Sequence, residues 1–214
     1  MSNTENRPLY ELVIGIPTSG MVDWRFTSSL MGLQLPGNTR VIWQVRSMID
    51  TARNSIVKTF LNGPGKYLLM IDDDMTFDPD FVLKLIEHDV DIVGGLAFKR
   101  RPDFHPCVYR QNKKNKNYYP ILPEVFQEVD IVGTGGMLIK LDVLKKLKEP
   151  WFTTGYDEKN IHWSVDFNFC KLAKKEGFKV FVDPEAEMGH IGDSPVIKKV
   201  DFIKTLNKQK NECS

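Results

Sequence analysis

The chain has 214 residues, of which 42% are hydrophobic and 27% charged, and its formal net charge is +1. A chain of this size and composition is expected to form one globular domain with a sizeable core. The nearly balanced charge argues against nucleic acid as the main partner, because a phosphate-binding surface normally shows in the total. Cys107, Cys170 and Cys213 are far apart and lack C-x-x-C spacing, which indicates neither a disulfide framework nor a zinc site and favours a reducing cytoplasm.

The termini predict neither export nor a membrane span. The segment 1–8 is polar and lacks the apolar core of a signal peptide. No apolar run approaches the roughly 20 residues that cross a bilayer. We therefore expect a flexible N-terminus over 1–8, a single domain over 9–195 and a basic C-terminal helix or tail over 196–214, in a protein that is not secreted by that route.

Strands and helices are expected to alternate through the first 97 residues. Short apolar runs predict the strands, and apolar residues at helical spacing predict the helices. Ser47 with Asp50 resembles a capping box, and Asp78 before Pro79 resembles an N-cap. This alternation favours an α/β domain with a mostly parallel central mixed sheet flanked by helices. The predicted strands are 12–16, 39–45, 68–71 and 91–97, and the predicted helices are 24–33, 49–60 and the segment that follows Asp78.

The second half of the chain is expected to be less regular. The segment 99–119 carries a basic triplet, two prolines and a run rich in Lys and Asn, so we predict a long loop or an irregular hairpin with a solvated tip. Lys99, Arg100 and Arg101 follow a strand end, where they either hold phosphate or form a solvated face. The later predicted elements are strands at 129–132, 137–139 and 178–182, a helix from Leu141, a helix from Asp166 to Gly177, and a tail helix with Ile197, Val200, Ile203 and Leu206 on its apolar side.

Asp72, Asp73 and Asp74 are the most informative stretch of the chain. They directly follow the apolar run at 68–71, which predicts a buried strand. Consecutive like charges at a strand end repel one another unless a cation offsets them. Because side chains alternate along a strand, Asp72 and Asp74 are expected on one side, where they can share a metal ion. Their oxygen ligands suit magnesium or manganese.

Two other templates match this stretch only in part. The segment 72–76 has the D-x-D-x-T pattern of haloacid-dehalogenase phosphatases, in which the first Asp is the nucleophile. The candidate for their later acidic pair, Gly192-Asp193, follows no apolar strand. A calcium loop that begins at the same residue needs Gly and Glu where the chain has Phe77 and Leu83. The phosphatase and a non-catalytic nucleotide- or sugar-binding module both remain possible interpretations of this stretch.

Several motifs in a fixed order together resemble a known family. Ala-Arg-Asn at 52–54 precedes the apolar strand with its aspartates, and Asp-Pro-Asp follows at 78–80. The segment 166–180 and a late histidine, His190, complete the order. Over about 12–190 the chain resembles GT-A fold glycosyltransferases, family-2-like. The resemblance implies a single GT-A, Rossmann-like domain that uses Mn²⁺ or Mg²⁺ to transfer a sugar from a nucleotide sugar to an acceptor hydroxyl.

The resemblance also implies roles for individual residues. Asp166 would be the general base that takes the proton from the acceptor hydroxyl, with inversion at the anomeric carbon. The metal would stabilise the departing nucleoside diphosphate. Among the three aspartates, Asp73 is expected to matter least. The residues implied in nucleotide contact are Pro17, Thr18, Arg53, Asp72 and Asp73, those implied in metal binding are Asp72, Asp74 and His190, and those implied near the substrate are Gly135, Gly136 and Trp163.

The chain departs from the family pattern at two places. Val165 stands where the family has a Glu before the base, so the acidic pair is reduced to one residue. Arg46-Ser47 follows the second predicted strand, where the family often has acidic residues and a Gly that help to bind the nucleobase. A UDP-sugar is the expected donor, and a glycan, a lipid-linked glycan or a small molecule is the expected acceptor. The residues predict no particular oligomeric state.

Overall fold

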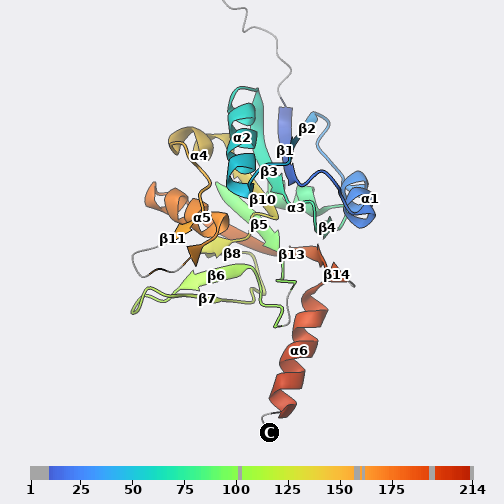
Figure 1. The fold of residues 1–214 in the computed structure, drawn as a ribbon, viewed down its shortest axis with the longest axis vertical. Coiled ribbons are helices and arrows are strands. Elements are labelled where there is room, and N and C mark those ends of the chain that lie inside the picture. The colour runs from blue at the N-terminus through green and yellow to red at the C-terminus, as the bar shows by residue number, and fades with distance from the viewer. Residues whose placement is uncertain (1–9, 101–102, 157–159, 161, 193–195, 213–214) are drawn as a thin grey trace, which may run out of the picture.

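The computed structural model describes residues 10–100, 103–156, 160, 162–192 and 196–212. The predicted flexible N-terminus lies outside these ranges. The described part of the chain is an α/β fold in which helices flank a central mixed sheet (Figure 1). At this level the predicted fold class is confirmed.

Three parallel strands form one half of the sheet. Strand β1 lies between β2 and β3 and pairs in parallel with both. Side chains from β1 and β3 enter the core on both faces: Val13 and Leu68 belong to one buried cluster, and Ile14 and Leu69 belong to the other. Strand β2 lies at the edge of the sheet, and its residues are exposed or half-buried. Strands covered on both faces read as continuous apolar runs, which is why the sequence predicted them. The bounds are β1 Tyr10–Thr18, β2 Thr39–Val45 and β3 Gly65–Ile71.

The other half of the sheet makes it mixed. Strand β10 runs antiparallel between β3 and β5, and β13 pairs in parallel with β5. The order is β14-β13-β5-β10-β3-β1-β2, and β4 and β8 pair with β13. This arrangement brings the ends of β3 and β5 to the same edge of the sheet. The bounds are β4 Met75–Phe77, β5 Ile92–Leu96, β8 Gln127–Val129, β10 Gly136–Lys140, β13 Val180–Ile191 and β14 Val196–Ile197.

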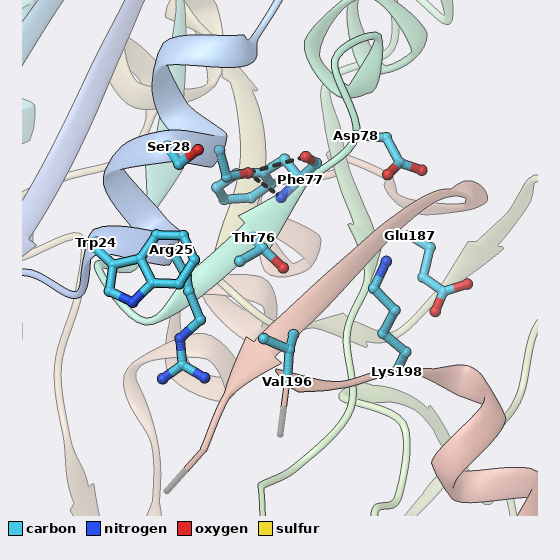
Figure 2. A pocket seen from close by; sticks show the side chains of 10 residues that line it. Trp24, Arg25, Ser28, Thr76, Phe77, Asp78, Glu187, Val196 and Lys198 are labelled. Carbon is cyan, nitrogen blue, oxygen red and sulfur yellow. Dashed lines mark hydrogen bonds between the residues drawn. The ribbon is translucent and has the colours of Figure 1, made fainter. Parts of the chain in front are cut away.

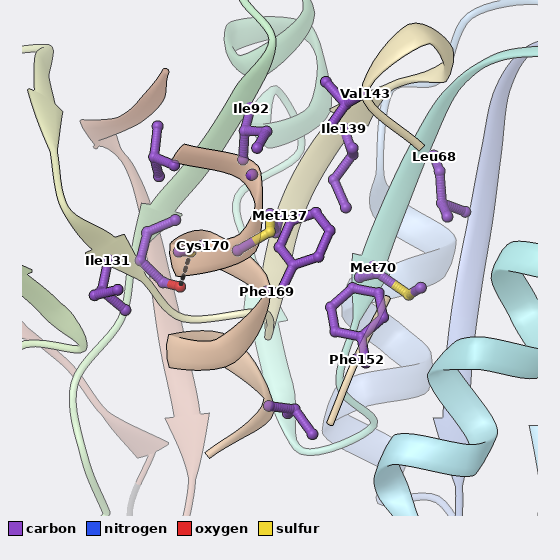
Figure 3. Close-up of a cluster of buried hydrophobic side chains, with 14 of the residues drawn as sticks. Leu68, Met70, Ile92, Ile131, Met137, Ile139, Val143, Phe152, Phe169 and Cys170 are labelled. Carbon is purple, nitrogen blue, oxygen red and sulfur yellow. Dashed lines mark hydrogen bonds between the residues drawn. The ribbon is translucent and has the colours of Figure 1, made fainter. Parts of the chain in front are cut away.

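Helices cover both faces of the sheet. Helices α2, α4 and α5 pack on one face, where Phe152 and Phe169 stack with ring centroids 4.5 Å apart near Met70 and Ile139 (Figure 3). Helices α1 and α3 pack on the other face. Each large apolar side chain buried in this way contributes about 1.5–3 kcal/mol. The bounds are α1 Trp24–Gly32, α2 Ile49–Leu61, α3 Phe81–Glu87, α4 Leu141–Lys146 and α5 Val165–Lys175.

The predicted helix caps are wrong, although the helices are present. Helix α2 has Met48 at its N-cap with no side-chain hydrogen bond, and Asp50 accepts from the backbone N–H of the next residue, so Ser47 and Asp50 form no capping box. Asp78 is not the N-cap of α3, which begins after Asp80. Strand β4, which was not predicted, lies between the carboxylates and this helix and pairs with β13.

The segment after β5 forms a small sheet of its own. It contains the predicted irregular hairpin, and the Lys- and Asn-rich run lies at the exposed tip. The tail helix α6 extends away from the domain (Figure 1). Of its predicted apolar stripe, Val200 and Ile203 are exposed, and the helix packs through Phe202 against Phe98. The bounds are β6 Val108–Gln111, β7 Tyr118–Pro120, β9 Ile131–Val132, β11 Gly155–Tyr156, β12 His162–Trp163 and α6 Lys199–Glu212.

Candidate active site

The carboxylate run lies at the edge of the sheet where β1, β3 and β5 end. Strand β3 ends at Ile71, and the N–H of Met75 donates to the carbonyl of Asp72 to close a turn. The N–H of Asp72 donates to the carbonyl of Gly135, just before β10. This turn, and not alternation along a strand, brings Asp72 and Asp74 close together. Ligands of open α/β sheets bind at such an edge.

Arg53 holds Asp72 in place. Its Nη2 lies 2.5 Å from Asp72 Oδ1, and its side chain is only 3% exposed. Arg53 is buried because it stands three and four residues before Ile56 and Val57, on the buried side of α2. The buried Nε of Arg53 has no hydrogen-bond partner among the residues that the structure describes. Buried polar groups are normally paired, so this Nε is an exception; the contact of Arg53 with a nucleotide stays a prediction.

The surroundings of Asp72 make its ionised form costly. Burial raises the pKa of Asp72 above its ordinary value, and Arg53 opposes that effect. The charges of Asp74 and Asp166 raise the pKa of Asp72 further. Three carboxylates therefore act on one another at this edge, although Asp166 lies far along the chain. A carboxylate whose pKa is perturbed by burial and by neighbouring charges, as that of Asp72 is, is typical of functional sites.

Asp74 faces two basic side chains. His190 Nε2 and Arg100 Nη1 each lie 3.3 Å from Asp74 Oδ2. Burial acts to raise the pKa of Asp74, but the hydrogen bond from His190 and the charges of His190 and Arg100 outweigh it and lower that pKa. His190 Nδ1 lies 2.8 Å from the carbonyl oxygen of Phe98. That nitrogen must carry a proton, because a carbonyl oxygen only accepts, so Nε2 is the atom that can take a proton or a metal ion opposite Asp74.

The residues around Asp74 fit a Mg²⁺ or Mn²⁺ ion. A histidine whose other ring nitrogen donates to a backbone carbonyl, as His190 does, has the orientation of metal-bound histidines. Within the described ranges, no group of three or more His, Cys, Asp or Glu side chains is arranged as metal ligands. These ions do not require one, because they commonly bind one or two carboxylates together with substrate phosphates and water. Ligation by Asp72, Asp74 and His190 stays a prediction.

Asp166 lies in the first turn of α5, where the helix dipole favours a carboxylate. Its Oδ1 accepts a hydrogen bond of 2.7 Å from Thr134 Oγ1, and Thr134 is only 1% exposed. One carboxylate oxygen is therefore fixed by a buried hydroxyl. Val165, which stands where the resembled family has Glu, is 4% exposed and belongs to the core.

The two glycines that were expected near the substrate differ in their surroundings. A side chain at Gly135 would lie 3.5 Å from Asp72 Oδ2, so this glycine borders the carboxylates. A side chain at Gly136 would overlap Met188 Sδ at 2.2 Å and the ring of Phe81 at 2.8 Å. Gly136 is buried, and it allows close packing instead of making room for a substrate.

Trp163 belongs to an aromatic group at the start of α5. Its ring lies 5.5 Å from that of Tyr118 and 5.0 Å from that of Phe167, and the Lys171 ammonium is 4.8 Å from its centroid. The indole is half-buried in this group. Trp163 precedes Asp166 by three residues, and its contact with a substrate stays a prediction.

Pro17 and Thr18 end strand β1 at the same edge. Pro17 is buried and Thr18 half-buried. The carbonyl of Thr18 accepts from the N–H of Arg46 at 2.9 Å. Arg46 has a φ of 56°, and a side chain at Gly20 would approach its Nε to 3.4 Å, so Arg46 folds over the loop that follows β1. Asp73 is half-buried within the turn.

Two residues of the site region had no role assigned from the sequence: Thr134 and Asn54. For the basic triplet the sequence left open a phosphate contact or a solvated face; Arg100 lies beside Asp74, and Arg101 lies outside the described residues. Asn54 accepts from the N–H groups of Trp151 and Phe152 at 2.9 and 3.0 Å and donates to the carbonyl of Phe152 at 2.7 Å. It ties helix α2, which carries Arg53, to the segment after α4. The Ala-Arg-Asn motif was the only sequence signal for Asn54, and that motif did not predict the hydrogen-bond partners of Asn54.

A separate pocket is lined by residues of α1, β4, β13 and β14 (Figure 2). Its volume is about 290 Å³. Thr76 and Lys198 line it beside Trp24, whose indole is 76% exposed. Met75, the neighbour of Thr76, packs in the core instead. In the described part of the chain, none of the predicted site residues lines this pocket.

None of the described helices is both long enough and apolar enough to cross a bilayer.

Comparison with known proteins supports the fold. The chain is similar to A197 from STIV, with a TM-score of 0.65 and 20% sequence identity over 88% of this chain and 90% of that chain. At this identity the likeness concerns the fold alone. No known protein family matches the chain, and no curated protein matches it.

Proposed function

We propose that this protein is a metal-dependent glycosyltransferase with a GT-A fold, which transfers a sugar from a nucleotide sugar, most simply a UDP-sugar, to an acceptor hydroxyl. One observation carries the proposal. Asp72, Asp74 and Asp166 meet at one edge of the sheet, where the charges of the last two raise the pKa of the first. Carboxylates that can bind a cation and a carboxylate that can act as a base then lie in one site.

Asp166 acts as the base in this proposal. Thr134 donates to one oxygen of its carboxylate, and the other oxygen remains to accept the proton of the acceptor hydroxyl. As the acceptor oxygen forms its bond to the anomeric carbon, the bond from that carbon to the diphosphate oxygen breaks. The proton moves to Asp166 in the same step. A single displacement of this kind inverts the anomeric centre.

The donor side of the site is formed by the other two aspartates. Asp74 and His190 would hold the metal ion, which when bound supplies positive charge to the departing diphosphate. Arg53 fixes the orientation of Asp72 through the 2.5 Å contact, so Asp72 is placed without needing the ligand. Pre-positioned groups of this kind lower the barrier because they need no reorganisation during reaction.

The first test replaces the proposed base. Asp166→Asn keeps the hydrogen bond from Thr134 but cannot accept a proton, so the rate of transfer should fall by about 10²–10⁴. The nucleotide is chosen beforehand by thermal shift with UDP, GDP or dTDP and Mn²⁺, and turnover is followed as release of the nucleoside diphosphate from the corresponding sugar donor. Donor affinity should stay close to that of the unsubstituted chain. Comparable loss of binding and turnover would contradict the assignment, and release of inorganic phosphate from a simple monoester would favour the phosphatase.

The second test removes the proposed metal ligand. Asp74→Ala should weaken Mn²⁺-dependent binding of the nucleoside diphosphate by at least about tenfold, because the ion loses its main carboxylate. Calorimetric titration with and without Mn²⁺ measures the effect. The matched control is Asp78→Ala, an exposed carboxylate that lies four residues further along the chain. Unchanged Mn²⁺-dependent binding in Asp74→Ala would remove the metal site from the proposal.

A further inference from the structure

Arg100 is the least constrained group in the candidate site. Its side chain is 53% exposed, and its Nη1 lies 3.3 Å from Asp74 Oδ2, an oxygen that it shares with His190. Charge-assisted hydrogen bonds between such groups are normally about 2.7–2.9 Å long. The contact is therefore long and exposed, and it can be exchanged at little cost.

The backbone beside Arg100 is nevertheless well anchored. Phe98 is fully buried, forms a bridge with Pro106 and accepts from His190 through its carbonyl. The N–H of Lys99 donates to the carbonyl of His105 at 3.0 Å. An extended, solvent-exposed guanidinium thus starts from a fixed position directly beside Asp74 and His190.

We propose that Arg100 pairs with Asp74 while the site is empty and moves its guanidinium to the diphosphate when nucleotide and metal bind. This inference rests on the proposed function, since it assigns a residue to the diphosphate of the donor. A metal ion on Asp74 Oδ2 would lie close to the Arg100 guanidinium, which is 3.3 Å from the same oxygen, and the repulsion between the two cations favours moving Arg100 away. The planar fork of an arginine matches phosphate oxygens.

The other arginine of the site is not available for this exchange. Arg53 is 3% exposed and lies 2.5 Å from Asp72, so moving it would leave a half-buried carboxylate without its partner. Arg100 faces Asp74, which is 31% exposed and also has His190 as a neighbour. The two ion pairs therefore have different roles. The Arg53–Asp72 pair keeps a carboxylate oriented, and the Arg100–Asp74 pair is broken when the ligands bind.

The exchange couples the two ligands. Metal alone must displace Arg100 from Asp74, whereas metal with nucleotide meets a site from which Arg100 has been drawn to the phosphates. The affinity for Mn²⁺ should therefore rise when the nucleotide is present by more than the direct metal–phosphate contact supplies. By linkage the same factor applies to nucleotide affinity in the presence of Mn²⁺.

Arg100→Ala separates this role from its alternatives, because it changes two affinities in opposite directions. Without nucleotide, Mn²⁺ should bind about two- to fivefold more tightly, since an exposed ion pair no longer competes. With Mn²⁺ present, UDP, or whichever of UDP, GDP and dTDP gave the largest thermal shift, should bind about tenfold or more weakly, since a charge-assisted contact to phosphate is lost. Free Mn²⁺ is measured by electron paramagnetic resonance and nucleotide binding by calorimetry.

Two further variants serve as controls. Arg100→Lys keeps the charge and loses the fork, so it should recover only part of the nucleotide affinity. Arg110→Ala removes an exposed arginine that bonds Gln127 in the small sheet, and it should change neither affinity. Loss of both affinities in Arg100→Ala would indicate a structural role, and no change in either would indicate a solvated side chain; each result overturns the inference. If the unsubstituted chain binds neither Mn²⁺ nor any of the nucleotides, the proposed function fails and this inference falls with it.

Discussion

Two charged clusters lie at opposite ends of strand β3, and their charges are balanced differently. Near the start of the strand, Asp89 accepts from the hydroxyl of Tyr67 at 2.8 Å and pairs with the Lys140 ammonium at 2.9 Å. The Asp89 side chain is 70% exposed. The hydrogen bonds from Lys140 and Tyr67 lower the pKa of Asp89. Every member of this cluster has a neutralising or hydrogen-bonding partner, and nothing in it calls for a ligand.

The cluster after the end of the strand is organised in the opposite way. Burial raises the pKa of Asp72, and Arg53 holds it with a guanidinium whose Nε has no partner among the described residues. Asp74 shares its contacts between His190 and an exposed Arg100. The two ends of one strand can therefore differ: the charged cluster at its start is fully paired among its own residues, which makes it self-sufficient, whereas the cluster after its end has groups whose contacts are incomplete or exposed. The second kind is where ligands are expected.

The largest expected effect comes from breaking the Arg53–Asp72 pair. Arg53→Met leaves Asp72 in a buried position without its counter-charge. Loss of one partner of a buried pair costs about 3–5 kcal/mol, and we expect about 2–4 kcal/mol here because Asp72 is 31% exposed and solvent screens part of its charge. Urea unfolding at pH 7 measures the change in the free energy of unfolding.

A double variant tests the cause of that loss. Arg53→Met with Asp72→Asn removes both charges, so it should recover at least half of the stability lost in Arg53→Met alone. Lys58→Met on the same helix is the matched control: its pair with Glu149 is about half exposed on both sides, and its loss should cost less than about 1 kcal/mol. A double variant as unstable as the single one would mean that packing, and not charge, sets the effect.

Much of the fold could be predicted because its signals are local. The apolar runs of β1, β2, β3 and β5 and the spacing of α2 require no knowledge of distant residues. The missed elements depend on long-range pairing. Strand β4 has three residues and exists only because Met75 and Phe77 pair with β13, where His190 and Met188 are their partners. The predicted N-cap at Asp78 is also wrong, because α3 begins after Asp80.

The sequence predicted the carboxylates of the candidate site, and it also named Arg53 and His190, which lie beside Asp72 and Asp74, but it did not predict the ion pair that Arg100 forms. Asp72 and Asp74 stand out because consecutive acids at a strand end have no folding reason. The contact between Arg100 and Asp74 depends on β10 running between β3 and β5, which no local pattern reveals. The packing of Gly136 was likewise not predictable, because Met188, which a side chain at Gly136 would overlap, comes from the distant strand β13.

The smallest expected effect lies in the self-sufficient cluster and appears only at alkaline pH. Tyr67 is 2% exposed. Burial and the hydrogen bond to Asp89 raise the pKa of Tyr67 to about 12, against about 10 in the unfolded chain. Because the folded value is the higher one, the stability that the protonated phenol contributes is fully present below about pH 10. It is lost as pH rises from about 10 to about 12.

Tyr67→Phe isolates this contribution. At pH 8 the variant should be about 1 kcal/mol less stable, because the hydrogen bond to Asp89 is gone. By about pH 11 the unsubstituted chain should have lost about 1.4 kcal/mol that the variant keeps, which exceeds the initial difference of about 1 kcal/mol, so the two stabilities should cross slightly below about pH 11. Urea unfolding at pH 8, 10 and 11 measures the difference, with Tyr119→Phe, at a tyrosine that is 46% exposed, as the control. A gap that stays constant with pH would mean that Tyr67 ionises equally in both states, and the contrast between the two ends of β3 would then rest on the site end alone.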